Sequence, residues 1–207
     1  QYDKPNDPPS KDATVMVTVT DPFAEPRIHK NFPGGPEELE SYRQEVVGGI
    51  HDHWIDPVAG KWTYTYHERL FAYCPVDDLR NPDTARPLAI INQIQYIIDA
   101  LAETSHTRRA QAITWMPTAD PQTDDPPCLQ RIWCRLIADG GDGFILNMNT
   151  HWRSRDLYRA WYMNVYALTD LQRIIAEEIS KKINKPVKVG RYVDMTDSLH
   201  IYGSSLE

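Results

Sequence analysis

Asp124-Asp125-Pro126-Pro127-Cys128 runs directly into Leu129-Gln130-Arg131-Ile132-Trp133-Cys134-Arg135-Leu136-Ile137, so a cysteine stands where a proline-rich loop meets an apolar segment. The apolar segment predicts a β-strand over residues 129–137, and the two prolines favour a stiff, extended backbone just before it. A thiol held in this way suits an aimed nucleophile, but a single cysteine is often structural. The stretch alone leaves both interpretations open.

The segments on either side of this strand predict a mixed fold. Residues 139–143 carry the glycines of a hairpin turn, and residues 144–150 form the returning strand. Helical periodicity predicts amphipathic helices over residues 88–104 and 164–183, with strands over 110–115 and 187–193. This order predicts an α/β (α+β) fold, a single domain over residues 1–207 with a large mixed β-sheet packed by long helices.

The N-terminal part of the chain carries weaker signals. Residues 1–12 are polar and predict a loose lead-in, whereas the β-branched residues 14–19 predict a strand. A proline followed by two glutamates predicts a helix over residues 36–47, ending at Gly48-Gly49. Residues 62–66 alternate aromatic and hydroxyl side chains and predict a half-buried strand, whose rings are either core packing or a pocket wall. Residues 77–87 predict a loop.

Composition limits the function classes. The chain has 207 residues, 41% of them hydrophobic and 25% charged, with a net charge of −7, which argues against a uniformly basic nucleic-acid binder. No apolar run reaches the ~20 residues needed to cross a bilayer, so we expect no membrane partner. Three cysteines without a CxxC pair indicate free thiols and a cytoplasmic protein. Cys134 follows Cys128 at an even spacing along the predicted strand, and we expect it to be buried and unreactive. His51 and His53 lack further ligands at a recognised spacing, so we expect no metal site.

Several polar motifs then recur in a fixed order. An Arg-Arg pair is followed about twenty residues later by Pro-Cys, about twenty-five later by Arg-Ser-x-Asp, and eight later by an asparagine. The chain closes with an Asp-x-x-His-x-Tyr pattern. The residues concerned are Arg108, Arg109, Cys128, Arg153, Ser154, Asp156, Asn164, Asp197, His200 and Tyr202. This order resembles the thymidylate synthase family in its short, archaeal-type branch, over residues 90–202 and more thinly over 32–69.

The resemblance implies an enzyme that methylates dUMP to dTMP. Cys128 matches the nucleophile that adds to C6 of the pyrimidine, and Asn164 matches the asparagine that binds the uracil edge. Asp156 matches a residue near the pyrimidine and the pterin. Glu25 matches the family's proton-handling glutamate in a poorly aligned region. The implied one-carbon donor is a reduced methylene-pterin, either 5,10-methylenetetrahydrofolate or a methanopterin-type analogue, with no metal.

The resemblance also implies how the rest of the nucleotide is held. Arg153 and Ser154 match phosphate-binding residues of the same subunit. Arg108 and Arg109 match an arginine pair that reaches the phosphate from a partner subunit, so a homodimer is implied. An arginine pair at a strand entrance can grip a phosphate through forked hydrogen bonds, although such pairs are commonly surface residues.

His200 and Tyr202 match the pair that holds the deoxyribose hydroxyl, although both can also be packing residues. Asp156 can alternatively cap the segment that follows it. Arg155 and Arg159 match no motif, and we expect them on the surface.

The chemistry is consistent with these roles. C5 of uracil is a poor nucleophile until a thiolate adds at C6, and a nearby arginine such as Arg153 favours the thiolate by charge attraction. The amide of Asn164 offers a donor and an acceptor that match O4 and N3–H of uracil, whereas cytosine presents the opposite pattern. The alternatives are a pyrimidine-nucleotide hydroxymethylase and a non-catalytic nucleotide-binding protein of the same fold. Residues 62–69 lack the glycines of the family's Gly-Pro-x-Tyr-Gly element, which leaves the donor side open.

Overall fold

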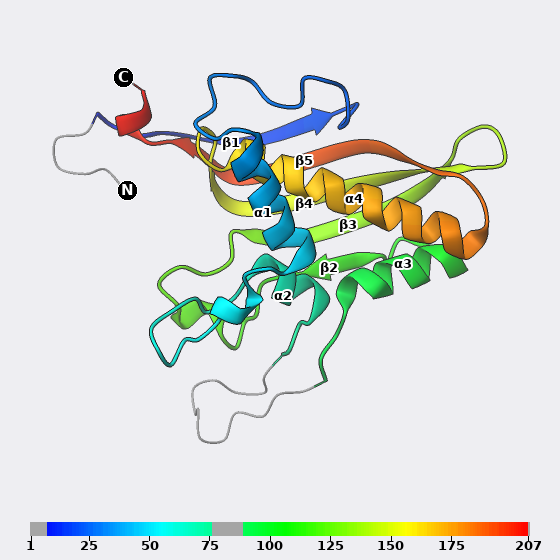
Figure 1. The fold of residues 1–207 in the computed structure, drawn as a ribbon, viewed down its shortest axis with the longest axis horizontal. Helices are drawn as coiled ribbons and strands as arrows, with labels where there is room; N and C mark the ends of the chain where they lie inside the picture. Colours follow the sequence, from blue (N-terminus) through cyan, green and yellow to red (C-terminus); the bar gives the residue numbers. More distant parts are fainter. Residues whose placement is uncertain (1–7, 76–88, 207) are drawn as a thin grey trace.

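The fold is built on a mixed β-sheet, against which the helices pack (Figure 1). The computed structural model describes residues 8–75 and 89–206. The sheet has five strands in the order β1-β5-β4-β3-β2, and the β4–β5 pair is parallel while the other pairs are antiparallel. The strands are β1 (Lys11–Val19), β2 (Gln111–Ile113), β3 (Leu129–Ala138), β4 (Phe144–Asp156) and β5 (Val187–Ile201). The prediction of a large mixed sheet packed by long helices is confirmed.

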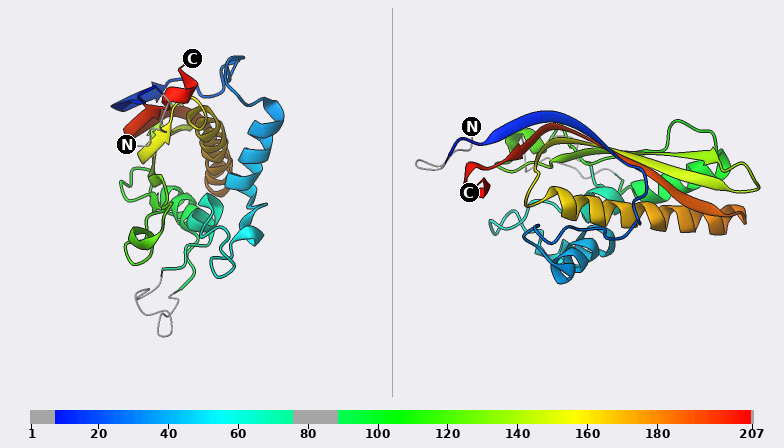
Figure 2. Two further views of the ribbon diagram at one scale, coloured as in Figure 1. Left: turned by 90° about the vertical axis from the view of Figure 1, so that its left-hand side faces the viewer. Right: turned by 90° about the horizontal axis from the view of Figure 1, so that it is seen from above.

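The helices cover one face of this sheet (Figure 2). They are α1 (Pro36–Gly48), α2 (Tyr66–Phe71), α3 (Gln93–Glu103) and α4 (Trp161–Ile183). Helix α4 connects β4 to β5, which is the crossover that a parallel strand pair requires. Its apolar stripe, including Leu171, Ile175 and Ile179, is buried in the same core cluster as Leu146 and Met148 of β4.

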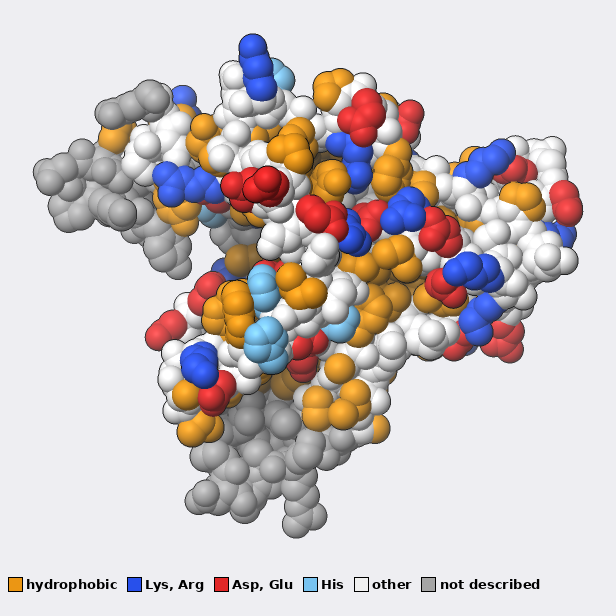
Figure 3. Space-filling model, viewed as in Figure 1, with side chains coloured by type: hydrophobic (Ala, Val, Ile, Leu, Met, Phe, Trp, Pro, Cys, Tyr) orange, Lys and Arg blue, Asp and Glu red, His pale blue; other side chains and the backbone are white. Residues whose placement is uncertain are grey.

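Helices α1 and α4 are also joined by charge. Arg43 of α1 pairs with Glu40 at 2.6 Å and with Asp170 of α4 at 3.1 Å, and Asp170 pairs with Arg173 at 2.7 Å. Figure 3 shows acidic and basic side chains interleaved over this surface. No helix within residues 8–75 and 89–206 is long and apolar enough to cross a membrane.

The opposite face of the sheet carries exposed apolar side chains. Cross-strand partners share a face, so the register aligns one residue from each strand in a single row. That row consists of Met16, Met195, His151, Arg131 and Ile113. Met16 is 71% exposed, and Met195 and Ile113 are each 41% exposed. We call this surface the outer sheet face.

Two strands run further than the sequence predicted. The polar residues 151–156 continue β4 instead of ending it at residue 150, and β5 continues to Ile201 instead of ending at 193. Ser154 pairs with Ser198, and Asp156 pairs with His200, in the parallel ladder. Strand length here is decided by backbone pairing, which the polarity of the side chains does not reveal.

Other predicted boundaries also need correction. Residues 11 and 12 belong to β1 and not to a loose lead-in, because Lys11 pairs with Ile201. Helix α3 begins at Gln93 because Asn92 caps it, accepting a hydrogen bond from the Gln95 amide at 2.8 Å. Helix α4 begins at Trp161, three residues before the predicted start, while α1 agrees with the prediction to one residue.

The strand predicted over residues 62–66 is wrong. The Thr65 hydroxyl accepts a hydrogen bond from the Glu68 amide at 2.9 Å and caps α2, so Tyr66 is already helical. Threonine followed three residues later by glutamate is a helix-start signal that outweighed the two-residue alternation. The loop predicted over residues 77–87 and the beginning of the lead-in lie outside the described residues.

Candidate active site

The backbone around Cys128 is fixed on both sides. The Arg153 amide of β4 donates to the Cys128 carbonyl oxygen at 2.9 Å, and the Leu129 amide donates to the Tyr66 hydroxyl oxygen at 3.3 Å. The Cys128 side chain is half-buried, whereas Cys134, further along β3, is fully buried as expected. Of the two cysteines on this strand segment, only the one at the end of the proline-rich loop borders solvent; Cys74, elsewhere in the chain, is also partly exposed.

The loop before Cys128 is tied down by a buried ion pair. Arg69 of α2 pairs with Asp120 at 2.7 Å, and the Met116 amide donates to the same carboxylate at 2.6 Å. Arg69 and Asp120 are both buried, so the pair is shielded from solvent. Removing one partner would leave an uncompensated charge. The loop is thereby anchored well before it reaches the thiol.

A pocket of about 790 Å³ opens beside Cys128, within the range of small-molecule sites. It lies where the loop, the ends of β4 and β5, and the start of α4 meet. Seven of the ten predicted site residues line it: Cys128, Arg153, Ser154, Asp156, Asn164, His200 and Tyr202. The extension of β4 and β5 in parallel brings these sequence-distant residues together.

Arg153 serves the loop as well as the pocket. Its Nε donates to the Pro127 carbonyl at 3.1 Å, and its Nη2 donates to the Pro126 carbonyl at 2.5 Å. Burial raises the pKa of the Cys128 thiol, while the Arg153 charge acts in the opposite direction. The expected attraction by Arg153 is present, but burial outweighs it, so the pKa is not lowered overall.

Asn164 is held by a tyrosine that sequence reasoning missed. Its Nδ2 donates to the Tyr42 hydroxyl oxygen at 2.6 Å, and both side chains line the pocket. Burial raises the pKa of Tyr42 well above its usual value, which keeps the hydroxyl protonated. Tyr42 lies on α1, more than a hundred residues from Asn164 in the sequence, and no motif marked it.

Arg155 is buried, which corrects the expectation of a surface residue. It is only 3% exposed, forms an ion pair with Asp194 of β5, and donates to the Thr196 hydroxyl at 2.8 Å. Its guanidinium lies over the Trp152 ring at 4.2 Å from the centroid. The buried residues of β4 alternate at even positions up to Trp152, so the two-residue pattern does not predict a buried Arg155. The carboxylate that neutralises it comes from a strand distant in sequence. Arg159, by contrast, is exposed as expected.

Asp156 combines a pocket position with the capping role considered for it. Its Oδ1 accepts hydrogen bonds from the Tyr158 and Arg159 amides at 2.8 and 3.0 Å, which shapes the turn before α4. Near it, the His200 ring lies edge-on to Tyr202 with centroids 4.8 Å apart.

Glu25 lies outside this group. It is exposed, does not line the Cys128 pocket, and accepts a hydrogen bond from the Arg27 amide at 3.1 Å. The carboxylate of Glu45, by contrast, lines a second cavity, of about 650 Å³, together with Tyr64. Tyr42 and Tyr66 line both cavities, so the two adjoin. The aromatic stripe at residues 62–66 is therefore a pocket wall.

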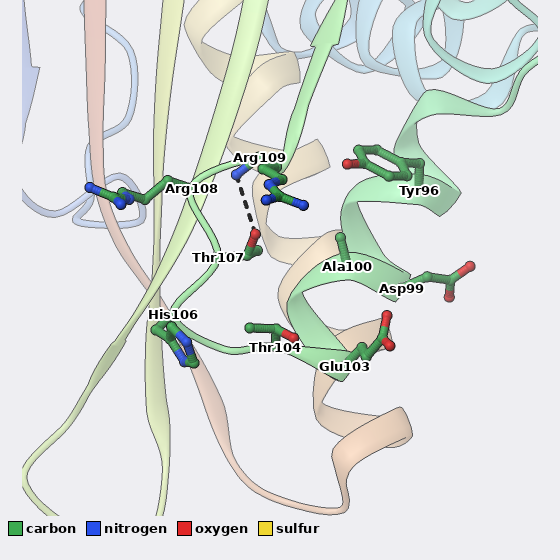
Figure 4. A pocket seen from close by; sticks show the side chains of 9 residues that line it. All are labelled: Tyr96, Asp99, Ala100, Glu103, Thr104, His106, Thr107, Arg108 and Arg109. Atoms are coloured by element: carbon green, nitrogen blue, oxygen red, sulfur yellow. Dashed lines mark hydrogen bonds between the residues drawn. The ribbon is translucent and has the colours of Figure 1, made fainter.

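Arg108 and Arg109 line a different cavity, of about 590 Å³, between α3 and the segment before β2. Figure 4 shows the Arg109 side chain turned toward Tyr96 and α3, while Arg108 points to the opposite side. Neither arginine lines the Cys128 pocket of its own chain.

The described residues contain no group of three histidine, cysteine or acidic side chains that could hold a metal ion. His51 instead pairs with Glu45 at 2.8 Å and stacks on Trp54 at 3.8 Å between centroids.

Together, the mixed sheet and a half-buried thiol in a nucleotide-sized pocket define an α/β protein with a candidate cysteine-dependent active site. The family model described as thymidylate synthase matches residues 45–207. The chain belongs to the thymidylate synthase family, and the resemblance seen in the sequence is confirmed.

Curated archaeal relatives agree with this assignment. The chain is 29% identical over 188 residues to a Methanococcoides burtonii protein, covering 91% of this chain and 71% of that protein. It is 32% identical over 150 residues to one from Methanopyrus kandleri, covering 70% and 63%. It is 30% identical over 193 residues to one from Methanocaldococcus jannaschii, covering 91% and 73%. All three carry the name "Putative thymidylate synthase".

Proposed function

We propose that this chain converts dUMP to dTMP, with Cys128 as the nucleophile at C6 and a reduced methylene-pterin as the one-carbon donor. The observation that supports this most strongly is the single pocket shared by Cys128, Arg153 and Asn164. A thiol, a cation and an amide are the groups needed for addition to C6, for phosphate and for the uracil edge.

The chain's own residues account for the steps at the pyrimidine. The Cys128 thiolate forms a bond to C6, and the electron pair of the C5–C6 double bond moves toward C5 and O4. The amide of Asn164 binds N3–H and O4, which holds the ring and stabilises charge on O4. After C5 bonds to the one-carbon unit, its proton leaves to a base, and the electron pair left behind would break the bond between that carbon and the pterin nitrogen. The Cys128 thiolate would depart, and the C5–C6 double bond re-form, when a hydride from the bound pterin is added to the same carbon. We assign the proton-handling carboxylate to Glu45 in place of Glu25, because Glu45 lines the adjoining cavity with Tyr64.

The adjoining cavity fits a pterin. It has aromatic walls in Trp62 and Tyr64 and carboxylates in Glu45, Asp124 and Asp125, which suit a flat ring with amino donors. When bound there, a reduced methylene-pterin would supply both the one-carbon unit and the hydride.

A homodimer belongs to the same proposal. Arg153 and Ser154 line the pocket, but Arg108 and Arg109 do not, so they would need a second copy of the chain to reach the same phosphate. The outer sheet face offers exposed Met16 and Met195 for such an association.

Trapping with 5-fluoro-dUMP tests the function. The fluorine at C5 cannot leave as the proton does, so the enzyme, nucleotide and pterin should stay covalently joined and appear as one mass by intact-protein mass spectrometry. We expect the adduct in wild type and in Cys74→Ser, and its loss in Cys128→Ser. A binary complex alone, with every reduced methylene-pterin supplied, would overturn the proposal. A 5-hydroxymethyl product from dUMP would identify the hydroxymethylase alternative instead.

A further inference from the structure

The amide of Asn164 is held by a residue of another helix. Asn164 of α4 donates through Nδ2 to the hydroxyl of Tyr42 on α1 at 2.6 Å. Asn164 is only 6% exposed, and α1 and α4 are fixed to each other by the ion pair between Arg43 and Asp170. The contact therefore joins two rigid elements inside the pocket that also holds Cys128.

This contact decides which edge of the amide is left for a ligand. A primary amide carries two N–H donors on nitrogen and an acceptor on oxygen. When one N–H of Asn164 is given to Tyr42, the other N–H and Oδ1 form an adjacent donor and acceptor. Uracil matches that order through O4 and N3–H. Cytosine, with an acceptor at N3 and an amino group at C4, matches the amide only after it has turned by 180°.

The surroundings of Tyr42 favour the observed order. Tyr42 is half-buried, and burial of its hydroxyl raises its pKa, so the hydroxyl stays protonated and its oxygen offers lone pairs. Glu45 lies one helical turn further along α1, and its negative charge acts on the Tyr42 hydroxyl. That charge favours the hydroxyl proton turned toward Glu45 and a lone pair turned toward Asn164. A turned amide would bring Oδ1 against this lone pair, which is repulsive.

We infer that Tyr42 is a positioning residue that fixes the orientation of the Asn164 amide and thereby makes the pocket prefer uracil over cytosine nucleotides. The inference rests on the proposed function, in which Asn164 meets the base. It adds a specificity determinant from α1 that the site motifs do not contain.

Binding of dUMP and dCMP to the full chain, measured by titration calorimetry, tests this role. Tyr42→Phe removes the hydroxyl and keeps the ring. We expect the ratio of dUMP to dCMP affinity to fall about tenfold, as for the loss of one orienting hydrogen bond. Tyr192→Phe is the matched control, because the buried Tyr192 hydroxyl bonds Thr150 at 2.8 Å and lines neither the Cys128 pocket nor the cavity that adjoins it. That variant should keep the wild-type ratio.

A double-mutant cycle separates orientation from packing. In an Asn164→Ala background, Tyr42→Phe should leave the dUMP to dCMP ratio unchanged, because no amide remains to be oriented. Glu45→Gln keeps Tyr42 in place and removes the charge that orients its proton, so it should lower the ratio in the same direction. This second variant decides the matter even if Tyr42→Phe does not fold.

The outcomes separate a failure of the Tyr42 role from a failure of the proposed function. Wild type that binds dUMP no better than dCMP would overturn the uracil-nucleotide assignment itself. Wild type that prefers dUMP, with the preference intact in Tyr42→Phe or in Glu45→Gln, would overturn only the role of Tyr42.

Discussion

The backbone amide of Arg153 donates a hydrogen bond to the carbonyl oxygen of Cys128 at 2.9 Å, while the Arg153 side chain binds the carbonyls of Pro126 and Pro127. One residue of β4 thus fixes the loop and also places a positive charge near the thiol. The charge opposes the effect of burial on the pKa of Cys128. Geometry and electrostatics at the nucleophile therefore depend on the same side chain.

Removing the Arg153 charge should make the thiol harder to ionise. Burial already raises the pKa of Cys128, and Arg153 is the largest opposing influence. In Arg153→Met, we expect the pKa to rise further, so alkylation by iodoacetamide reaches its half-maximal rate at a higher pH. The measurement is the pH dependence of alkylation in a Cys74→Ser background.

Two variants control that experiment. Arg159→Met removes an exposed arginine that lines the same pocket, and Arg159 is not among the charges acting on the thiol. Its pH profile should match that of the parent. Cys128→Ser should abolish the alkylation signal, since Cys134 is fully buried. A profile in Arg153→Met that coincides with the parent would contradict the electrostatic role.

Arg155 and Asp194 should show the behaviour of a buried ion pair. Both side chains are buried, and Trp161 donates a further hydrogen bond to Asp194 at 2.9 Å. Arg155→Met leaves the Asp194 charge without its cation, so we expect the free energy of unfolding to fall by about 3–5 kcal/mol. Urea denaturation followed by tryptophan fluorescence measures this change.

The double variant Arg155→Met with Asp194→Leu provides the internal control. It removes both charges together, so it should recover at least half of the stability lost in the single variant. If the double variant instead loses as much unfolding free energy as the two single substitutions added together, the two residues act independently.

Arg155 and Tyr42 show what the sequence can and cannot predict. Periodicity predicted the α4 stripe and the hairpin between β3 and β4, because local pattern decides these elements. The motifs predicted Cys128, which lies in the pocket. The Arg155 partner on β5 and the Tyr42 contact to Asn164 depend on how distant elements pack, and no local pattern encodes that.

Glu68 should make stability depend on pH in the neutral range. Burial raises its pKa to about 7, although Arg69 acts in the opposite direction. The folded state therefore holds this proton more tightly than the unfolded state, so the stabilisation is complete below the unfolded pKa, near 4.5. It is lost as pH rises toward 7 and above.

The variant Glu68→Gln tests that sign. At pH 8 it should be more stable than wild type by about 2 kcal/mol, allowing for partial exposure of the side chain. At pH 5 most of the difference should disappear. Glu37→Gln, an exposed acid in the first turn of α1, should show no such trend in the same urea series. A constant difference between wild type and Glu68→Gln across pH would contradict the prediction.

The outer sheet face should carry the proposed dimer. Met195 lies within the cross-strand row, between Met16 and His151, so a charge there would be buried without a partner in a face-to-face association. We expect Met195→Asp to be monomeric by sedimentation velocity at concentrations where wild type is dimeric. Val58→Asp, at a site that is 99% exposed, should leave the dimer intact.

Because Arg108 and Arg109 do not line their own chain's pocket, monomeric Met195→Asp should also bind dUMP more weakly than wild type. Unchanged dUMP affinity in a monomeric variant would show that the phosphate needs no second copy of the chain.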